Sequence, residues 1–339
     1  MKRMLVVQNF VTCTIAVEFA SFALMLHAQN LDGSASARLD VSRSHHASAD
    51  GDSVLSPKET KVFITDAETI QEKEAEDDRL AQQYIYKTVG VKPLALYVWR
   101  PEKPQADGKA PAIVLFHGGG FKSGNYTQFR EQARYFASRG MVAVSVNYRL
   151  TSEQGVKIED CIEDAKSAMR WVRHHAVKLG VDPARIAAGG GSAGGFLAVV
   201  TLMFEDINAH TDPPGVSANP DALVLFNPAF CDRGTEDGKP SRRDPEGKGD
   251  LKKYIAPHQP PCICFYGSAD PFLSGAILFQ EAYKKAGNRC EIVTYKGETH
   301  RFFNKDKYRE LTLAEADTFL VSLGWLRKEA KKTSSDDAE

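Results

Sequence analysis

Residues 189–195 read Gly-Gly-Gly-Ser-Ala-Gly-Gly and contain the pattern G-x-S-x-G around Ser192. The pattern lies between a short apolar run, Arg185–Ala188, and an apolar segment with helical character, Phe196–Phe204. In such a strand–turn–helix the serine hydroxyl stands above the end of a sheet, and the flanking glycines relieve crowding in the tight turn. Alone, the pattern is equally compatible with a plain glycine-rich turn, so its meaning depends on the rest of the chain.

A second glycine-rich segment, His117-Gly118-Gly119-Gly120-Phe121, directly follows the apolar run Ala112–Phe116. Glycines at such a place let backbone N–H groups approach a substrate carbonyl oxygen without an intervening side chain. The string H-G-G-G occurs in the oxyanion loops of lipases and esterases. A phosphate-binding loop would need G-K-[ST], and a dinucleotide site would need G-x-G-x-x-G followed by an acid; neither pattern is present in these segments.

A serine nucleophile needs a base, and the base needs an acid that orients it. His300 is the candidate base, because it follows an expected strand, Glu291–Tyr295, in a loop near the C-terminus. Asp270 is the candidate acid, since it follows the expected strand Ile263–Tyr266, and α/β sites gather at the carboxyl ends of strands. Asp232, which comes after the expected strand Ala222–Phe226, is the alternative acid. The resulting chain order, Ser then Asp then His, is the one used on a strand–turn–helix nucleophile.

Strand and helix signals alternate along the chain from about residue 84. Further strands are expected over Tyr84–Val89, Leu94–Trp99, Met141–Val146 and Ala222–Phe226. Helices are expected over Gln128–Arg139, Glu159–Leu179, Gly275–Ala286 and Leu313–Lys328. This alternation predicts βαβ units and therefore a three-layer α/β fold, with a mostly parallel central sheet flanked by helices.

The candidate residues and loops together resemble the α/β-hydrolase superfamily. The closest likeness is to its acetyl esterase/lipase branch, related to the hormone-sensitive lipase-like carboxylesterases. The strings HGGGF, GGGSAGG, GSADPFL and ETHRFF carry the resemblance, and they spread over about residues 84–328. The resemblance implies a Ser192–His300–Asp270 triad without a metal or organic cofactor. It also implies an oxyanion hole formed by the N–H groups of Gly119, Gly120 and Ala193.

These features predict a secreted serine esterase that cleaves carboxylic esters through an acyl-enzyme. The substrate would be a small-molecule or polysaccharide ester, and the resemblance extends to enzymes that remove acetyl or feruloyl groups from plant polysaccharides. A serine peptidase of the prolyl-oligopeptidase type is an alternative, although residues 29–83 are too short for the β-propeller of such enzymes. A non-catalytic binding protein on the same fold is a third hypothesis, but such proteins usually lack a member of the triad.

The N-terminus has the pattern of an export signal. Lys2 and Arg3 precede an apolar stretch over residues 5–26, and small residues follow, so residues 1–28 are expected to be a signal peptide of a secreted or periplasmic protein. Residues 29–83 are expected to be disordered or loosely ordered because they are polar and nearly free of aromatic residues. Residues 84–330 form the expected catalytic domain, and residues 331–339 a disordered tail.

Composition excludes several partners and folds. Lys and Arg number 43 against 44 Asp and Glu, so the basic excess typical of nucleic-acid binding is absent. No second apolar stretch could span a bilayer after signal cleavage. Six cysteines at irregular spacing do not form a disulfide framework, and Cys262 and Cys264 are expected to be buried small side chains of one strand. The long polar segment Cys231–His258 is expected to be a surface insertion, and a loop of this length could border a site.

Arg149 is expected to have a structural function. It follows the expected strand Met141–Val146 and precedes a helix that carries Asp160 and Asp164. A guanidinium can pair with either carboxylate and tie the loop to the helix. We therefore expect Arg149 to contribute to stability rather than to chemistry.

Overall fold

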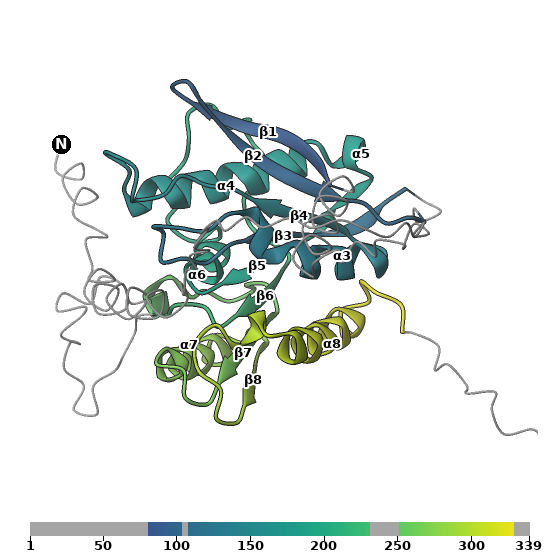
Figure 1. Cartoon of the computed structure of the whole chain (residues 1–339), viewed down its shortest axis with the longest axis vertical. Helices are drawn as coiled ribbons and strands as arrows, with labels where there is room; N and C mark the ends of the chain where they lie inside the picture. Colours follow the sequence, from purple (N-terminus) through teal and green to yellow (C-terminus); the bar gives the residue numbers. More distant parts are fainter. Residues whose placement is uncertain (1–80, 104–107, 231–250, 329–339) are drawn as a thin grey trace, which may run out of the picture. The chain divides into compact units, whose positions relative to one another are not determined.

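The computed structural model describes residues 81–103, 108–230 and 251–328 (Figure 1). This part of the chain contains one eight-stranded sheet with the strand order β1-β2-β4-β3-β5-β6-β7-β8. Pairs β1–β2 and β2–β4 are antiparallel, and the other neighbours are parallel. The strands are β1 Gln82–Val89, β2 Lys92–Trp99, β3 Ala110–Phe116, β4 Val142–Val146, β5 Val181–Gly191, β6 Ala222–Phe226, β7 Cys262–Gly267 and β8 Cys290–Tyr295.

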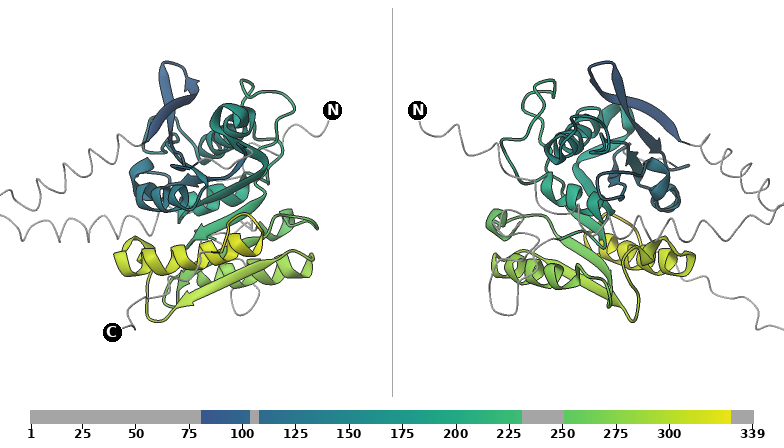
Figure 2. Two further views of the ribbon diagram at one scale, coloured as in Figure 1. Left: turned by 90° about the vertical axis from the view of Figure 1, so that its right-hand side faces the viewer. Right: turned by 60° about the vertical axis from the view of Figure 1, so that its left-hand side comes forward.

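Helices cover both faces of this sheet (Figures 1 and 2). Helices α3 and α8 contact each other on one face, and α4 and α6 contact each other on the opposite face. The helices are α3 Arg130–Ser138, α4 Ile158–His174, α5 Ala176–Leu179, α6 Ala193–Val200, α7 Leu273–Lys285 and α8 Asp306–Ser322, with 3₁₀ turns η1 Tyr126–Phe129, η2 Leu251–Tyr254 and η3 Phe302–Asn304. The predicted three-layer α/β architecture is confirmed.

The central strands are apolar because both of their faces are covered. Every residue of β3, β4 and β6 is buried, as expected for parallel strands between two helix layers. On β7 the side chains alternate between the two layers. Ile263 and Phe265 join the core cluster that includes residues of α3 and α8, whereas Cys262 and Cys264 point to the other face. Because the strands are held between the two helix layers, the loops that follow their carboxyl ends are held in place at one edge of the sheet.

Several element boundaries differ from the predictions. The helix expected over Glu159–Leu179 is broken at His175 into α4 and α5. Strand β5 begins at Val181 and continues through Gly191, well beyond the short strand expected over Arg185–Ala188. Helix α8 begins at Asp306 rather than Leu313, and it ends at Ser322. None of these shifts changes the order of the elements.

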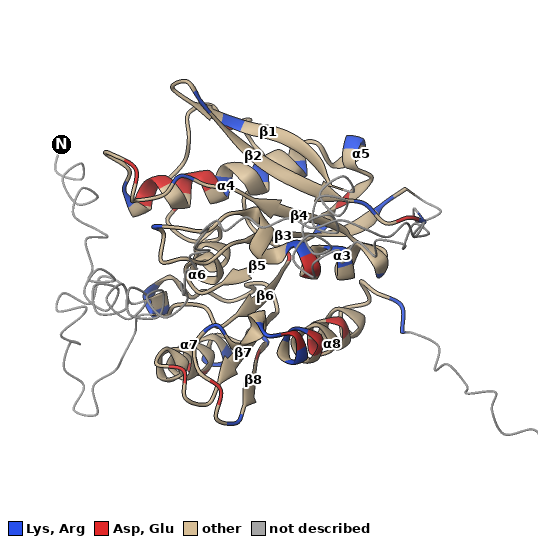
Figure 3. Cartoon of the chain, viewed as in Figure 1, with Lys and Arg blue, Asp and Glu red and all other residues tan. Residues whose placement is uncertain are grey.

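A buried ion cluster fastens the loop after β4 to the start of α4. Arg149 donates from Nε and Nη2 to the two carboxylate oxygens of Asp164, at 2.7 Å each, and from Nη1 to Asp160 at 2.9 Å. Lys87 on β1 donates to the same Asp164 and to Glu163, at 2.8 and 2.6 Å. Figure 3 shows the acidic residues, coloured red on the ribbon, in the N-terminal half of α4. The expected pairing of Arg149 with the helix is confirmed.

Some predictions fall on residues that the structure does not describe. The signal at 1–28, nearly all of the segment 29–83, the tail 331–339 and most of the insertion Cys231–His258 lie outside the described residues, and export stays a prediction. Among the described residues, Cys161, Cys262, Cys264 and Cys290 are free buried thiols. No helix in this described part combines the length and the apolar composition that a membrane span requires.

Candidate active site

Ser192 occupies the sharp turn between β5 and α6. Its backbone has φ 51° and ψ −118°, a left-handed conformation that a non-glycine residue rarely adopts. The turn is held on both sides, because the Ser192 N–H donates to the Phe226 carbonyl at 3.1 Å and its own carbonyl accepts from Ala229 at 3.0 Å. The backbone strain is therefore maintained by β6, and it raises the serine side chain above the end of the sheet.

The glycines beside Ser192 are required by the close approach of two backbones. A Cβ on Gly190 would lie 2.5 Å from the Phe116 carbonyl oxygen, and a Cβ on Gly194 would collide with the same oxygen and with that of His117. The first turn of α6 therefore packs directly against the end of β3. The G-x-S-x-G pattern thus reflects steric needs on both sides of the serine, as the sequence predicted.

His300 bridges the other two candidate residues. Its Nε2 lies 2.8 Å from Ser192 Oγ, and its Nδ1 lies 2.8 Å from Asp270 Oδ2. With the ring proton on Nδ1, His300 donates to Asp270 and accepts from the serine hydroxyl. His300 is 108 residues from Ser192 and 30 residues from Asp270 along the chain. The structure brings the three together at the carboxyl ends of β5, β7 and β8.

The Asp270 carboxylate is held in position by its own turn as well as by His300. Its Oδ1 accepts from the Phe272 N–H at 2.9 Å, which leaves Oδ2 directed at His300. The carboxylate side chain is fully buried, whereas that of His300 is 22% exposed. The rival acid Asp232 lies outside the described residues. Glu298, two residues before His300, instead pairs with Lys305 at 2.6 Å.

The loop after β3 is held by side chains from two other segments, η1 and the segment after β4. The Gly118 N–H donates to Gln128 Oε1, and the Tyr148 hydroxyl donates to the His117 carbonyl at 2.7 Å. The His117 ring stacks on Tyr148 with 4.2 Å between centroids, and its Nδ1 lies 2.8 Å from the Gly118 carbonyl. His117 therefore supports the glycine loop and does not face Ser192 as a second base.

The predicted oxyanion donors belong to two segments that meet at Ser192. Gly119 and Gly120 have φ of 113° and 62°, which opens the loop backbone in a way that favours glycine. Ala193 is the first residue of α6, so its N–H has no partner within the helix. Gly118 lies against Ser192, because a Cβ on Gly118 would be 3.3 Å from the serine Cβ. The loop after β3 and the first turn of α6 thus meet at the serine.

Burial of His117 predicts an acid-sensitive fold. Burial lowers the pKa of the His117 imidazole to about 4, against an ordinary value of 6.5. Between pH 6.5 and pH 4 the imidazole is protonated in the unfolded chain but neutral in the folded chain. The contribution of His117 to the free energy of unfolding is therefore fully present above pH 6.5 and is lost as the pH falls towards 4. The expected loss is about 3 kcal/mol.

Urea unfolding at a series of pH values from 7 to 4 measures this loss. The matched variant His117→Asn is expected to be less stable at pH 7 but to show a shallower decline towards acid. An equal pH dependence in the two proteins would exclude His117 as its source.

Asn227 is a site residue that the sequence predictions missed. Its side-chain amide nitrogen lies 3.1 Å from Nδ1 and 3.3 Å from Nε2 of His300. The residue is fully buried at φ 39° directly after β6, and its N–H donates to the Phe265 carbonyl at 2.8 Å. Among the described residues its Oδ1 has no hydrogen-bond partner. The one feature of the sequence that could have indicated Asn227 as a site residue is its position at the carboxyl end of a buried strand.

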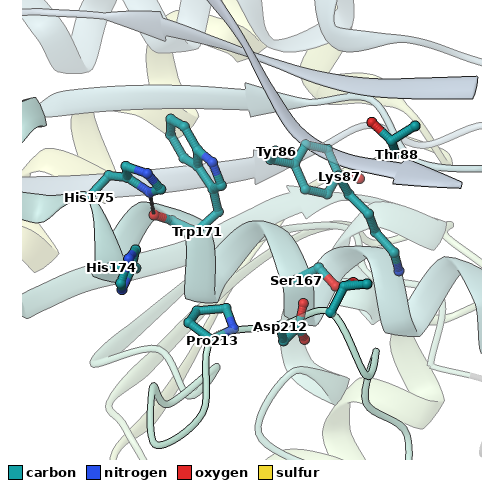
Figure 4. A pocket seen from close by; sticks show the side chains of 10 residues that line it. Tyr86, Lys87, Thr88, Ser167, Trp171, His174, His175, Asp212 and Pro213 are labelled. Atoms are coloured by element: carbon teal, nitrogen blue, oxygen red, sulfur yellow. Dashed lines mark hydrogen bonds between the residues drawn. The ribbon is translucent and has the colours of Figure 1, made fainter.

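A separate pocket lies beside β1 and α4 (Figure 4), and it contains none of the candidate triad. Trp171, His174 and His175 line it at the C-terminal end of α4, which lies at the opposite end of the sheet from Ser192 because α4 runs back towards the start of β5. His174 is exposed, and His175 stacks on Trp171 at 4.2 Å. The interpretation of both histidines as surface or packing residues therefore agrees with their surroundings.

Comparison with known proteins identifies the family. The BD-FAE family model matches residues 96–214. An AB hydrolase superfamily protein of Schizosaccharomyces pombe is 31% identical over 265 residues, which cover 65% of this chain and 74% of that protein. The structure of the esterase Est2 of Thermogutta terrifontis with propionate bound has 41% identity and a TM-score of 0.68, and the match covers 74% of this chain and 97% of Est2. The chain belongs to the α/β-hydrolase superfamily.

Within this superfamily the chain groups with the carboxylic ester hydrolases of the esterase/lipase type. Esterase LipI of Mycobacterium tuberculosis is 41% identical over 103 residues, but the aligned segment covers only 30% of this chain and 31% of LipI. A second Est2 structure, phosphorylated by paraoxon, matches with a TM-score of 0.67 and 41% identity. The family resemblance inferred from the motifs is therefore confirmed, and so are the α/β-hydrolase fold and the enzyme class.

Proposed function

We propose that this α/β hydrolase cleaves carboxylic esters with short acyl groups through an acyl-enzyme on Ser192. The observation that supports this most is the position of His300, 2.8 Å from both Ser192 Oγ and Asp270 Oδ2. His300 removes the hydroxyl proton as Ser192 Oγ attacks the ester carbonyl, and it then returns the proton to the leaving alcohol. Water repeats the attack on the acyl-enzyme, and His300 again acts as base and then as acid.

The remaining residues act on charge and geometry. Asp270 holds the Nδ1–H tautomer of His300 and stabilises the imidazolium that forms during the attack. The N–H groups of Gly119, Gly120 and Ala193 donate to the carbonyl oxygen as it becomes an oxyanion. Each such donor contributes about 3–4 kcal/mol in enzymes of this kind. Asn227, whose amide lies against both ring nitrogens, limits rotation of the imidazole.

The preference for short acyl groups is supported by the solved structures. Est2 of Thermogutta terrifontis, whose length this chain covers almost fully, has been determined with propionate bound and with butyrate bound. The acetyl groups of plant polysaccharides fall within this acyl range. Their feruloyl groups are larger aromatic acyl groups, so feruloyl esters are the alternative substrate that the experiment below distinguishes. Both kinds of substrate require the same chemistry at Ser192 and differ only in what lies beyond the scissile ester.

A panel of p-nitrophenyl esters of increasing acyl length tests the proposal, run beside acetylated and feruloylated xylan. We expect kcat/KM to be greatest from acetate to butyrate and to fall at least about tenfold by octanoate, because a short acyl pocket rejects added methylenes. Acetate or ferulate release from xylan would place the substrate among polysaccharide esters. A maximum at long acyl chains would contradict the proposed acyl range, and absence of hydrolysis of every ester would contradict the function.

A further inference from the structure

Three buried cysteines converge at the amino ends of the last two strands. Cys262 begins β7, Cys290 begins β8, and the two are direct partners in the parallel register. Cys264 lies two residues further along β7 and so on the same face as Cys262. Each of the three is at most 1% exposed. Their sulfur atoms all lie within 4.8 Å of one another, and those of Cys262 and Cys264 are 3.6 Å apart.

The spacing of these sulfurs matches a single three-coordinate metal ion. A metal–sulfur bond of about 2.3 Å in a planar trigonal arrangement separates the sulfurs by about 4.0 Å. The observed separations, 3.6 Å for one pair and no more than 4.8 Å for any pair, bracket this value. Small side-chain rotations therefore suffice to bring all three sulfurs to bonding distance, without movement of the strands.

The surroundings favour a soft ion that accepts three ligands. In the described part of the chain, no histidine or carboxylate joins the three thiols as a fourth ligand. The nearby phenol hydroxyls are already used, since Tyr283 donates to the Pro260 carbonyl at 2.9 Å and Tyr266 to the Pro228 carbonyl at 2.6 Å. Structural zinc sites are almost always four-coordinate, and iron–sulfur clusters require four cysteines. Thiolates select Cu(I), zinc and iron–sulfur clusters, and of these Cu(I) is the one that three ligands suit.

We propose that Cys262, Cys264 and Cys290 form a binding site for one Cu(I) ion. The ion bonds to all three sulfurs, and the three thiol protons that it displaces are released to the solvent. Cys290 directly follows Arg289, which is exposed, so the buried ligand is adjacent along the chain to a surface residue.

Copper binding would act on the edge of the sheet rather than on the ester chemistry. Strand β8 is the last strand of the sheet and pairs only with β7 within it. The cysteines begin these two strands, whereas Asp270 and His300 follow their other ends. An ion bound to both strands holds the edge strand in place and stabilises the folded chain by mass action. This inference is independent of the proposed esterase mechanism.

Anaerobic titration of the reduced full-length protein with Cu(I), against a competing Cu(I) chelator, tests the site. We expect one ion per chain, with X-ray absorption showing three sulfur neighbours at about 2.3 Å and no nitrogen or oxygen. Zn(II), titrated in parallel, should bind far more weakly. Failure to take Cu(I) from the chelator, a shell containing nitrogen or oxygen, or equal affinity for Zn(II) would each overturn the proposal.

Substitutions assign the ligands. Cys264→Ser and Cys290→Ser should each lower Cu(I) affinity by more than about 100-fold, since even the loss of an outer-shell partner costs 10–100-fold. The matched control Cys161→Ser changes a buried thiol that donates instead to the Arg149 carbonyl, and Cys231→Ser changes one outside the described residues. Both controls should bind as the parent does. If the serine variants fail to fold by circular dichroism, the absorption spectrum of the parent decides alone.

Discussion

Ser192→Ala is expected to lower kcat/KM toward p-nitrophenyl acetate by at least about 10⁴-fold, while the protein stays folded. The nucleophilic oxygen is lost, and His300 and the N–H donors can then do no more than assist a direct attack by water. Removal of the nucleophile from such a triad costs about 10⁶-fold in comparable serine enzymes, and the residual rate arises from the oxyanion donors and substrate binding. The backbone strain at φ 51° is the same for alanine as for serine, so stability should change little.

Two measurements keep this prediction sharp. Paraoxon should add one phosphoryl group per chain to the parent protein, located on Ser192 by peptide mass spectrometry, and none to Ser192→Ala. Ser138→Ala is a suitable control, because that hydroxyl is exposed at the end of α3 and donates to the Tyr135 carbonyl at 2.8 Å. It should retain full activity and full labelling. Full activity in Ser192→Ala would remove the mechanism.

Arg149→Ala is expected to lower the free energy of unfolding by about 3–5 kcal/mol, with little effect on the chemistry of the folded protein. The substitution leaves the carboxylate of Asp164, which is fully buried, without its two guanidinium hydrogen bonds. Breaking a buried ion pair from one side costs this much because the remaining charge is uncompensated. Lys87 still contacts Asp164 at 2.8 Å and keeps the loss from being larger.

Urea unfolding followed by circular dichroism measures the effect. Arg185→Ala provides the matched control, because Arg185 pairs with Asp182 at 2.8 Å on one strand and both side chains are partly exposed. Its expected loss is below about 1 kcal/mol. A large fall in kcat/KM for folded Arg149→Ala, with unchanged stability, would instead make Arg149 part of the active site.

The candidate site could be predicted because its chemistry requires an order that is visible in the sequence. Ser192, Asp270 and His300 each follow a recognisable strand, and parallel strands present their carboxyl ends at one edge of a sheet. The apolar run of β7 is unmistakable because both of its faces are buried. No measurement of distance was needed to expect the three side chains near one another. The distances themselves depend on packing that only the structure displays.

The remaining features have no local signal. The first turns of α8 are polar and largely exposed, so the apolar period starts only at Leu313, although the helix starts at Asp306. The first half of β5 contains Asp182 and Pro183, which carry no apolar strand pattern. Only Val181 of this half pairs with β3, opposite Ala110, and the regular pairing resumes at Ile186 after a register shift. Asn227 has no motif at all. It lies in the site because β6 is the strand between those of Ser192 and Asp270.

The three glycines at the end of β5 also determine where this enzyme can change. A Cβ on Gly189 would lie 2.6 Å from the Val224 carbonyl oxygen, and one on Gly191 would lie 2.5 Å from the Phe303 ring. The end of the strand that leads to the nucleophile, Gly189–Gly191, therefore has no side chains, and neighbouring atoms occupy the space that side chains would need. Substitutions that raise thermal stability are therefore not expected at Gly189–Gly191. Stabilising substitutions are expected instead at exposed positions such as Val91 and Val177. These residues are 99% and 97% exposed, so neighbouring atoms do not restrict the side chain there.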